Sequence, residues 1–394
     1  MKEGWTYKKL GELFPIVMGK TPPRNVSRYW DEKKETNNLW VSIADLSKYE
    51  GKEIHETKEH ISDEGKQGIK QIPKGSLLVS FKLTLGKMAF AGEKLYTNEA
   101  IMSLQRRDDV DLVFLYYYFS FLDWNKIASG NEKVKGKTLN KKSLSEILVA
   151  YIPLKDQHSI VARLDAAFAH IDALKANAEK QLTEARQLFQ AELTKCMRQK
   201  EGWEEKALGE VCIKSKNIKW DNVDEGKTFT YIDLTSVDRT DLQIHNPQII
   251  NKHNAPSRAK QIIHSGDIIF ATTRPTLRRV SLIDEQYDGD ICSTGFCVLR
   301  PDNNVVSEWI FYALQEEHFY SYIEPLQAGA NYPAVTDGDV KNYAIPIPSK
   351  DTQHSIVSRL DALSANIKKL EEVQRKTLAE CDAMKQAMLR EVFE

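Results

Sequence analysis

The sequence lacks a strong excess of charge of either sign, and it lacks a long apolar run. Its 394 residues contain 55 Lys and Arg against 56 Asp and Glu, so the formal net charge is -1. This balance excludes a uniformly basic DNA-coating protein, but it is compatible with basic patches on a neutral chain. No run approaches the roughly 18 apolar residues that a membrane-spanning helix requires. We therefore expect a protein without a membrane segment.

Cysteine is scarce and scattered. The five cysteines are Cys196, Cys212, Cys292, Cys297 and Cys381. An odd number without close pairs is typical of a reducing compartment rather than of a disulfide framework. The segment from Met1 to Trp5 is not the start of an apolar signal peptide. These features predict a cytoplasmic protein in which Cys292 and Cys297 are small buried apolar residues.

The sequence also lacks the motifs of nucleotide and metal chemistry. It contains neither the phosphate loop G-x-x-x-x-G-K-[ST] nor the dinucleotide motif G-x-G-x-x-G. His55 and His60 are close in sequence, but their spacing does not place both imidazoles on one helical face as H-E-x-x-H does. The absence of a catalytic constellation predicts a binding protein or a scaffold with no catalytic residue, no metal and no cofactor of its own.

The clearest feature that is present is an internal repeat. Residues 152–166 and 347–362 are identical at 13 of 15 paired positions when Thr352 is treated as an insertion. Glu3-Gly4-Trp5 likewise recurs as Glu201-Gly202-Trp203. The sequences between these tags diverge strongly, so each copy is a body of roughly 150 residues followed by a shared tail. Duplication for stability alone would explain the tags, but divergent bodies on similar tails favour two domains that bind different ligands.

We predict an α+β protein in four segments. These are a first body at residues 1–151, a helix at 152–200, a second body at 201–346 and a second helix at 347–394. The bodies have mixed α/β character, with short β-rich runs at 77–81, 268–271 and 297–300 and one aromatic helix each, at 112–124 and 307–322.

The two tails have the pattern of long amphipathic helices. Apolar residues recur every three or four positions, and neither Pro nor Gly interrupts them. Asp156 and Asp351 are the expected N-caps. A single helix of this length cannot bury its apolar stripe, so we predict an intramolecular antiparallel coiled coil with one body at each end and a pseudo-two-fold repeat. The residues expected in the helix–helix contact are Leu164, Ile171, Leu174, Leu182, Phe189, Leu360, Leu363, Ile367 and Leu370.

Basic residues gather in loops of both bodies although the whole chain is neutral. Such loops can follow a phosphate backbone, and arginine can pair with guanine through two hydrogen bonds. Any single Lys or Arg on a loop is equally well explained as ordinary solvated surface. The candidate DNA-binding residues are Lys20, Thr21, Lys82, Lys87, Lys133, Lys135, Lys137, Arg258, Arg274, Arg278, Arg279, Asn331 and Tyr332.

A family resemblance follows from three segments of the first body. Val17-Met-Gly-Lys-Thr-Pro22, then Tyr29-Trp30, then Leu39-Trp-Val-Ser-Ile-Ala-Asp45 resembles the opening of a target-recognition domain of type I restriction-modification specificity subunits. The two-copy layout extends the resemblance over essentially the whole chain. The chain departs from the family in the second body, where residues 215–219 replace the Gly-Lys-Thr-Pro opening. It also departs at the helix starts, where Lys-Asp-Gln and Lys-Asp-Thr-Gln replace a proline-rich segment.

The resemblance implies a non-catalytic subunit in which each body recognises one half of a bipartite, asymmetric target in double-stranded DNA. It implies that the helices set the unrecognised spacer and dock two methyltransferase subunits, which bind S-adenosylmethionine. Restriction subunits with motor and nuclease activity, which use ATP and Mg, would complete the assembly. The alternative is a coiled-coil adaptor whose two bodies bind proteins, for which no salt-dependent DNA affinity is expected.

Overall fold

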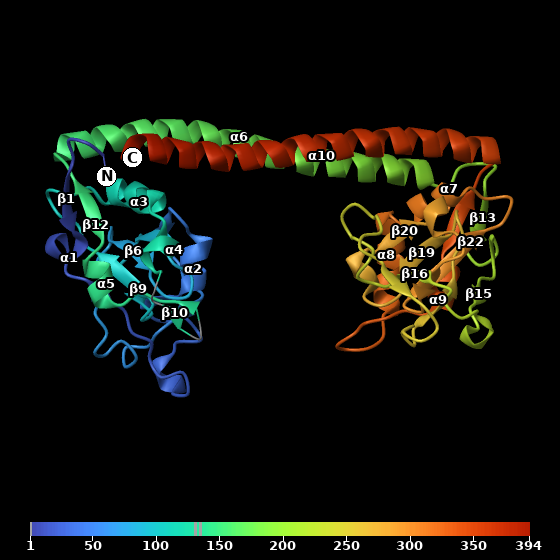
Figure 1. Ribbon diagram of the computed structural model, residues 1–394, viewed down its shortest axis with the longest axis horizontal. Helices are drawn as coiled ribbons and strands as arrows, with labels where there is room; N and C mark the ends of the chain where they lie inside the picture. The colour runs from blue at the N-terminus through green and yellow to red at the C-terminus, as the bar shows by residue number, and fades with distance from the viewer. Residues whose placement is uncertain (1, 130–131, 134–135) are drawn as a thin grey trace. The chain divides into compact units, whose positions relative to one another are not determined.

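A computed structural model describes residues 2–129, 132–133 and 136–394, with the backbone alone at 132–133 and 136–137. It divides into two compact units, residues 1–178 with 376–394, and residues 179–375. Each unit contains one mixed α/β body and the adjoining ends of two long helices, α6 (Leu154–Met197) and α10 (Lys350–Phe393) (Figure 1). The predicted fold class is therefore confirmed. No helix in the described part of the chain is long and apolar enough to cross a membrane.

The first body is built on a five-stranded sheet. Its order is β2 (Val17–Met18), β9 (Ile101–Leu104), β6 (Leu77–Ser80), β7 (Met88–Ala91) and β4 (Glu53–Ile54). Beside it lie a sheet of β5 (Glu59–His60), β3 (Leu39–Val41) and β8 (Tyr96–Thr97), and the pairs β1 (Thr6–Lys9) with β12 (Leu148–Tyr151) and β10 (Glu132–Lys133) with β11 (Gly136–Lys137). The helices are α1 (Leu10–Leu13), η1 (Ser27–Tyr29), α2 (Ile43–Lys48), α3 (Leu112–Phe121), α4 (Trp124–Ile127) and α5 (Lys141–Ser145).

The second body has a four-stranded sheet in the order β14 (Cys212–Ile213), β22 (Phe296–Pro301), β19 (Ile268–Ala271) and β20 (Val280–Leu282). A five-stranded sheet follows the order β15 (Lys216–Asn217), β18 (Ala259–Ile262), β21 (Ile291–Ser293), β16 (Phe229–Ile232) and β17 (Gln248–Ile250), and β13 (Glu204–Ala207) pairs with β23 (Ala344–Ile347). The helices are η2 (Trp220–Asn222), η3 (Pro275–Leu277), η4 (Glu285–Tyr287), α7 (Ser307–Ala313), α8 (Glu317–Ile323), η5 (Glu324–Leu326) and α9 (Asp337–Lys341).

The predicted aromatic helices are each divided in two. In the first body α3 ends at Phe121, because Leu122 is extended and Asp123 caps a separate helix by accepting from the Lys126 amide. In the second body α7 ends at Ala313, and the extended Glu316 precedes α8. Both pieces of each divided helix bury apolar side chains in the core of their body.

The N-caps predicted for the long helices are wrong by three residues in α6 and by two in α10. α6 begins at Leu154 and α10 at Lys350, so Asp156 and Asp351 lie inside the first turn. Carboxylates at that position still stabilise the helix, because they face the positive end of its dipole. The preceding proline sets the helix start in α6, where the Pro153 carbonyl accepts from the amides of Asp156 and Gln157.

The buried stripe of α6 follows a heptad pattern. Leu164, Ile171 and Ala178 are at most 3% exposed and lie seven residues apart, as one core position of a coiled coil requires. Leu174 does not occupy the other core position, since it is 51% exposed, and Lys175 lies there instead. The sequence admits steps of three or four residues from Ile171, and the structure uses the step of four.

The other predicted contact residues lie along the two seams. Leu360 is fully buried, whereas the following residues are half-buried: Leu182, Phe189, Leu363, Ile367 and Leu370. Leu164 and Leu360 also belong to the cores of the two bodies, so the stripes serve the helix–body contact as well as the helix–helix contact.

Phe393, near the end of α10, lies in an aromatic cluster of the first unit and is 2% exposed. Its ring centroid is 5.4 to 6.1 Å from those of Trp5, Phe114, Tyr118 and Phe121. The ammonium of Lys2 donates to the carbonyl oxygen of Glu391 at 3.0 Å. Residues almost 390 positions apart in sequence therefore complete one core.

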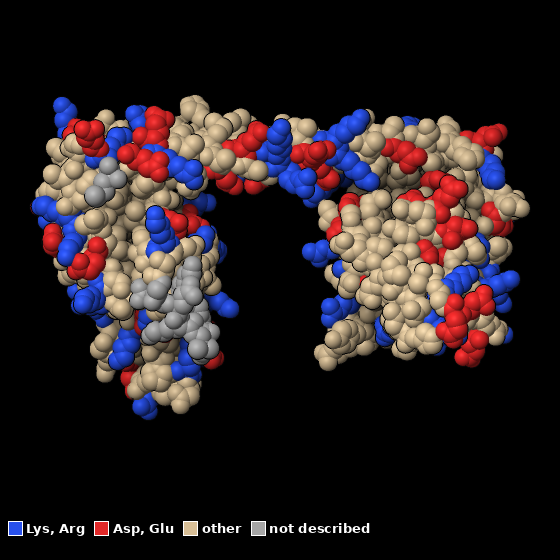
Figure 2. Space-filling model, viewed as in Figure 1, with Lys and Arg blue, Asp and Glu red and all other residues tan. Residues whose placement is uncertain are grey.

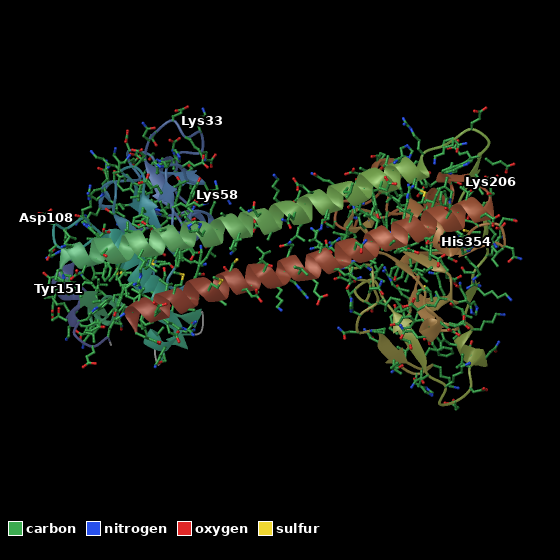
Figure 3. All side chains as sticks on the ribbon, turned by 90° about the horizontal axis from the view of Figure 1, so that it is seen from above. Lys33, Lys58, Asp108, Tyr151, Lys206 and His354 are labelled. Atoms are coloured by element: carbon green, nitrogen blue, oxygen red, sulfur yellow. The ribbon has the colours of Figure 1, made fainter. Side chains whose placement is uncertain are left out.

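A buried glutamine joins each long helix to its body. Gln157 is fully buried, accepts from the Asp111 amide at 2.8 Å, and donates to the carbonyls of Ile152 at 2.8 Å and Asp109 at 3.1 Å. Its repeat partner Gln353 makes the same three kinds of bond, to Val306, Pro348 and Asn304. One side chain thus satisfies three backbone groups, which explains the glutamine in both copies of the repeat. His354, the residue after Gln353, lies at the start of α10 (Figure 3).

A second contact that occurs in both units lies about two turns further along each long helix. The Tyr117 hydroxyl donates to Asp165 at 2.5 Å, and the Tyr312 hydroxyl donates to Asp361 at 2.6 Å. Burial, and then the hydrogen bond to the carboxylate, raise the pKa of both tyrosines. The neutral phenols are favoured in the folded state, so this contribution to stability is present below about pH 10 and is lost as the pH rises further.

Replacing Gln157 by alanine should selectively destabilise the first unit. Three backbone groups would lose their partner, at about 1 kcal/mol or more for each group, and we expect a total loss of about 3–4 kcal/mol. Differential scanning calorimetry should show a transition lowered by roughly 5–12 °C. Ser159→Ala, on the exposed side of the same turn, is the matched control. Equal stability of the two variants would contradict the role of Gln157 as a clamp that joins α6 to the first body.

Candidate nucleic-acid interface

Three chain segments of the first body meet at one edge of its five-stranded sheet. β2 pairs Met18 with Met102, and β6 pairs Ser80 with Ile101. The loops that follow β2 and β6 therefore leave the sheet beside the segment that leads into β9. Loops at one sheet edge are a common place for binding residues, since a rigid scaffold positions them.

The loop after β2 is held closely against the segment before β9. The Lys20 amide donates to the Thr97 carbonyl at 2.9 Å, and the Thr21 hydroxyl donates to the Glu99 carboxylate. A Cβ on Gly19 would lie only 2.0 Å from the Thr97 carbonyl oxygen, so no other residue fits there without displacing the backbone. This contact explains the glycine of the Gly-Lys-Thr-Pro segment and leaves the Lys20 side chain exposed.

Glu99 is a site residue that sequence reasoning missed. Its carboxylate is exposed at this edge. Burial opposes its ionisation, but the bond from Thr21 and the nearby charges of Lys82 and Arg24 together lower the pKa of Glu99 below its ordinary value. An ionised carboxylate among cations can accept a hydrogen bond from the amino group of cytosine.

The loop after β6 carries an exposed apolar side chain between two lysines. Leu83 has a φ of 63° and is 62% exposed, which is unusual for a leucine. Lys82 forms a backbone bridge with Thr138, so the segment after α4 joins the same edge. Lys87, in contrast, forms an ion pair of 2.6 Å with Glu50. The predicted residues Lys20, Thr21 and Lys82 are thus brought together, and Lys87 is held by the body itself.

Arg24 was also missed and lies in an aromatic cage. Its guanidinium is 3.9 Å from the ring centroid of Trp30 and 4.8 Å from that of Trp40. A second contact runs from Nη2 to Glu59 at 3.1 Å. The Tyr29-Trp30 and Leu39-Trp40 segments gave a signal for aromatic residues here, but their partner arginine could not be assigned from spacing.

The remaining candidates of the first body are Lys133, Lys135 and Lys137. Lys135 and the side chains of Lys133 and Lys137 lie outside the described residues.

The second body joins the equivalent loops by a chain of backbone hydrogen bonds. The Thr294 amide donates to the Arg258 carbonyl, and the Thr272 amide donates to the Gly295 carbonyl, both at 2.9 Å. Val335 in turn donates to the Thr272 carbonyl at 2.9 Å. The loop after β19, the turn before β22 and the segment after η5 therefore converge, as their counterparts do in the first body.

Arg274 lies at the apex of this second edge. Its amide donates to the Pro333 carbonyl at 2.7 Å, and its guanidinium donates to the Asn331 carbonyl at 3.3 Å. The same guanidinium lies 4.9 Å from the ring centroid of Tyr332, which is 70% exposed. Four predicted residues, Arg258, Arg274, Asn331 and Tyr332, thus occur on the connected segments of one edge.

Arg278 and Arg279 are engaged within the protein. Arg278 makes two bonds to the Glu317 carboxylate, at 2.5 and 2.6 Å, and covers the Tyr320 ring at 4.2 Å. Arg279 donates to the Leu234 carbonyl at 2.8 Å. Both side chains hold the loop against the body, and neither accompanies Arg274 at the apex.

Charge is mixed on the face of each body that Figure 2 shows. Figure 2 shows Lys and Arg interspersed with Asp and Glu in this view rather than gathered in one large basic face. Candidate DNA contacts are therefore local clusters on loops. Among the described residues, no three His, Cys, Asp or Glu side chains are placed to hold a metal ion, and Cys292 and Cys297 are buried as predicted.

Gly19→Ala should loosen the first edge. The added Cβ must displace the Thr97–Asn98 backbone, so we expect a loss of about 1–3 kcal/mol in the free energy of unfolding. Hydrogen exchange of the Lys20 amide should accelerate in parallel. Gly338→Ala, where the nearest atom is 3.5 Å from the new Cβ, is the control. Unchanged exchange at Lys20 would show that the loop does not depend on this close approach.

Comparison with known proteins agrees with the two-copy architecture. The chain matches the family described as type I restriction modification DNA specificity domain twice, over residues 2–184 and 200–380. The specificity subunit of type I restriction enzyme HindI from Haemophilus influenzae is 27% identical over 169 residues, which are 42% of this chain and 36% of that protein. The MjaIX specificity subunit from Methanocaldococcus jannaschii is 26% identical over 185 residues, which are 45% of this chain and 40% of that protein. These two alignments span less than half of either relative.

Longer but weaker similarity extends over most of the chain. The EcoBI specificity subunit from Escherichia coli is 18% identical over 82% of this chain and 75% of its own length. A chain solved in a study of the assembly and conformational transition of the type I R-M system has a TM-score of 0.75 at 21% identity, with 100% of this chain and 98% of that chain covered. The HsdS subunit from Thermoanaerobacter tengcongensis has a TM-score of 0.52 at 21% identity, over 100% and 97% of the chains. These two structures share the fold, and the double match over residues 2–184 and 200–380 shows that the chain belongs to the family of type I restriction modification DNA specificity domains.

Proposed function

We propose that this chain is the non-catalytic, sequence-recognising subunit of a type I restriction-modification complex in the cytoplasm. Each body recognises one half of a bipartite, asymmetric target in double-stranded DNA. The main supporting observation is that both units place the same set of loops at one sheet edge, and that each edge presents an exposed cation, Lys20 or Arg274, with an exposed apolar or aromatic side chain. The chemistry differs between the two edges, so two different half-sites are expected.

The first edge combines Lys20 and Lys82 with the Glu99 carboxylate and the Leu83 side chain. Lysines bind phosphate, a carboxylate accepts from cytosine, and an apolar side chain contacts the methyl group of thymine. The second edge presents Arg274 stacked on Tyr332, and an arginine held by an aromatic ring is suited to guanine.

The partners follow from the same proposal. Two methyltransferase subunits that bind S-adenosylmethionine dock on the long helices, and restriction subunits that use ATP and Mg join to cleave unmodified DNA. This chain contributes recognition and no cofactor. The names of the relatives, which are specificity subunits of type I restriction enzymes, support this division of labour.

The adaptor alternative predicts bodies whose loops bind protein and whose DNA affinity is independent of salt. If the bodies contact DNA phosphates, the DNA affinity must instead fall steeply with salt. The logarithm of the binding constant then decreases by about 0.9 for each phosphate contact per tenfold rise in salt concentration. A titration of the chain with its methyltransferase partner from ~50 to ~200 mM salt separates the two.

Substitutions at the two edges should affect opposite halves of the target. In single-molecule sequencing of methylated adenines, Lys20→Ala with Lys82→Ala should weaken or relax one half-site. Arg274→Ala should relax the other, at a cost of about 1–3 kcal/mol for a lost guanine contact. Arg278→Ala, which breaks an ion pair inside the body, is the control and should leave the half-site sequence unchanged. Loss of the same half-site in both edge variants would refute the assignment of one body to each half.

A matched pair of deletions tests whether the helices set the spacer. Removing residues 176–182 from α6 together with 375–381 from α10 preserves the heptad and the antiparallel register indicated by Lys175–Asp382 and Arg186–Glu371. The helices shorten by about 10 Å, so the accepted spacer should shorten by about 3 base pairs. Deleting residues 176–182 alone breaks the register and should abolish methylation. An unchanged spacer in the paired deletion would disprove the role of helix length.

A further inference from the structure

The two long helices are equivalent in length and pattern. α6 and α10 each contain 44 residues and begin 196 residues apart, so every position of one has a counterpart in the other. Both begin with the same clamp, Gln157 in α6 and Gln353 in α10. Apolar contacts are not directional, so two such similar seams would accept a like partner, α6 on α6 or α10 on α10, nearly as well as the unlike one.

Two ion pairs across the helices carry opposite charges at equivalent positions. In the first unit, Lys175 of α6 lies 2.7 Å from Asp382 of α10. In the second unit, Arg186 of α6 lies 2.8 Å from Glu371 of α10. Lys175 and Glu371 are counterparts 196 residues apart, and so are Arg186 and Asp382. α6 therefore supplies the cation in both pairs and α10 supplies the anion in both.

Like pairing in the same antiparallel register would bring equal charges together. Two copies of α6 would set Lys175 against Arg186, and two copies of α10 would set Glu371 against Asp382, each contact occurring twice by symmetry. A third ion pair between the helices increases the repulsion expected between two copies of α10. Lys385 of α10 lies 2.5 Å from Asp172 of α6. The counterpart of Asp172 is Lys368, so paired copies of α10 would also oppose two lysines.

One contact has the opposite preference. Arg359 of α10 pairs with Glu192 of α6, and the counterpart of Arg359 is Arg163, so two copies of α6 would retain an attractive pair there. α6 alone therefore discriminates less than α10. A dimer of the full chain that exchanged its helices would contain both like pairings, and the repulsive contacts would outnumber the attractive one. Each pair is partly exposed, for example 28% and 67% for Lys175 and Asp382, so selection depends on their sum.

We propose that these charges assign α6 to α10 of the same chain and reject a second copy of either helix. Charged residues that flank a coiled-coil seam commonly determine partner and orientation in this way, and the rejection of the wrong partner is as important as the attraction of the right one. The consequence is that one chain always joins its two different bodies. This inference rests on the helix contacts and is independent of the proposed DNA binding.

Two substitutions in the full-length chain reverse the preference without changing the net charge. In Lys175→Glu with Glu371→Lys, both contacts within the chain become repulsive, whereas like pairing of α6 and of α10 becomes attractive. At low salt we expect the dimer fraction, measured by native mass spectrometry and light scattering, to rise several-fold over wild type. If the double variant stays monomeric, its two repulsive contacts should lower the midpoint of thermal unfolding by several degrees. At about 1 M salt, where screening extends only ~3 Å, the difference should shrink.

The matched control adds Arg186→Glu and Asp382→Lys to the same two substitutions. This fourfold variant reverses every charge, so attraction within the chain and repulsion between copies are both restored, and it should match wild type in mass and midpoint. An insoluble double variant beside a soluble fourfold variant would also support the proposal. A double variant indistinguishable from wild type at low salt would overturn it, as would a fourfold variant that shares the defect of the double one.

Discussion

The joint between each long helix and its body depends on one buried glutamine. A body that hydrogen-bonded its own backbone completely would have no fixed attachment to a helix, and a purely apolar contact would tolerate rotation about the helix axis. Gln157 and Gln353 remove this freedom, because each bonds three backbone groups in a fixed geometry. The tyrosine–aspartate bonds, two turns further along each helix, supply the second point that fixes rotation.

This attachment lets the bodies diverge. The positions that are identical in the two copies of the repeat include the glutamine and the aspartate that bond the helix to the body, whereas the loops at the sheet edge differ between the copies. The same backbone connections link the edge loops in both units, through Lys82 with Thr138 in one and Thr273 with Ala334 in the other. The side chains on these loops can therefore change while the joint and the sheet stay constant, which suits a protein whose function we infer to be recognition of two unlike sequences.

The sequence predicted the repeat, the helices and the fold class because these depend on local periodicity and on identity between copies. It missed features that depend on tertiary contacts. The choice of Lys175 over Leu174 required the partner helix, since both spacings satisfy an amphipathic pattern. The break before α8 falls at Gln315 and Glu316, which are compatible with an uninterrupted helix and therefore gave no clear stop signal. At the candidate interface, consecutive arginines looked equivalent, and only the positions of Glu317 and the Leu234 carbonyl distinguish Arg278 and Arg279 from Arg274. Glu99 gave no signal, because an acid in a basic cluster is invisible until the loops are brought together.

The aromatic cluster around Phe393 also bears on how the protein is made. Trp5 and Phe114 leave the ribosome long before Phe393, yet the three rings form one core. The first body must therefore wait, incompletely packed, while more than two hundred further residues are synthesised, whereas every residue of the second unit lies within a continuous stretch of the chain. The unit that is translated second can thus finish folding first, and chaperone protection would be needed chiefly by the unit that is translated first.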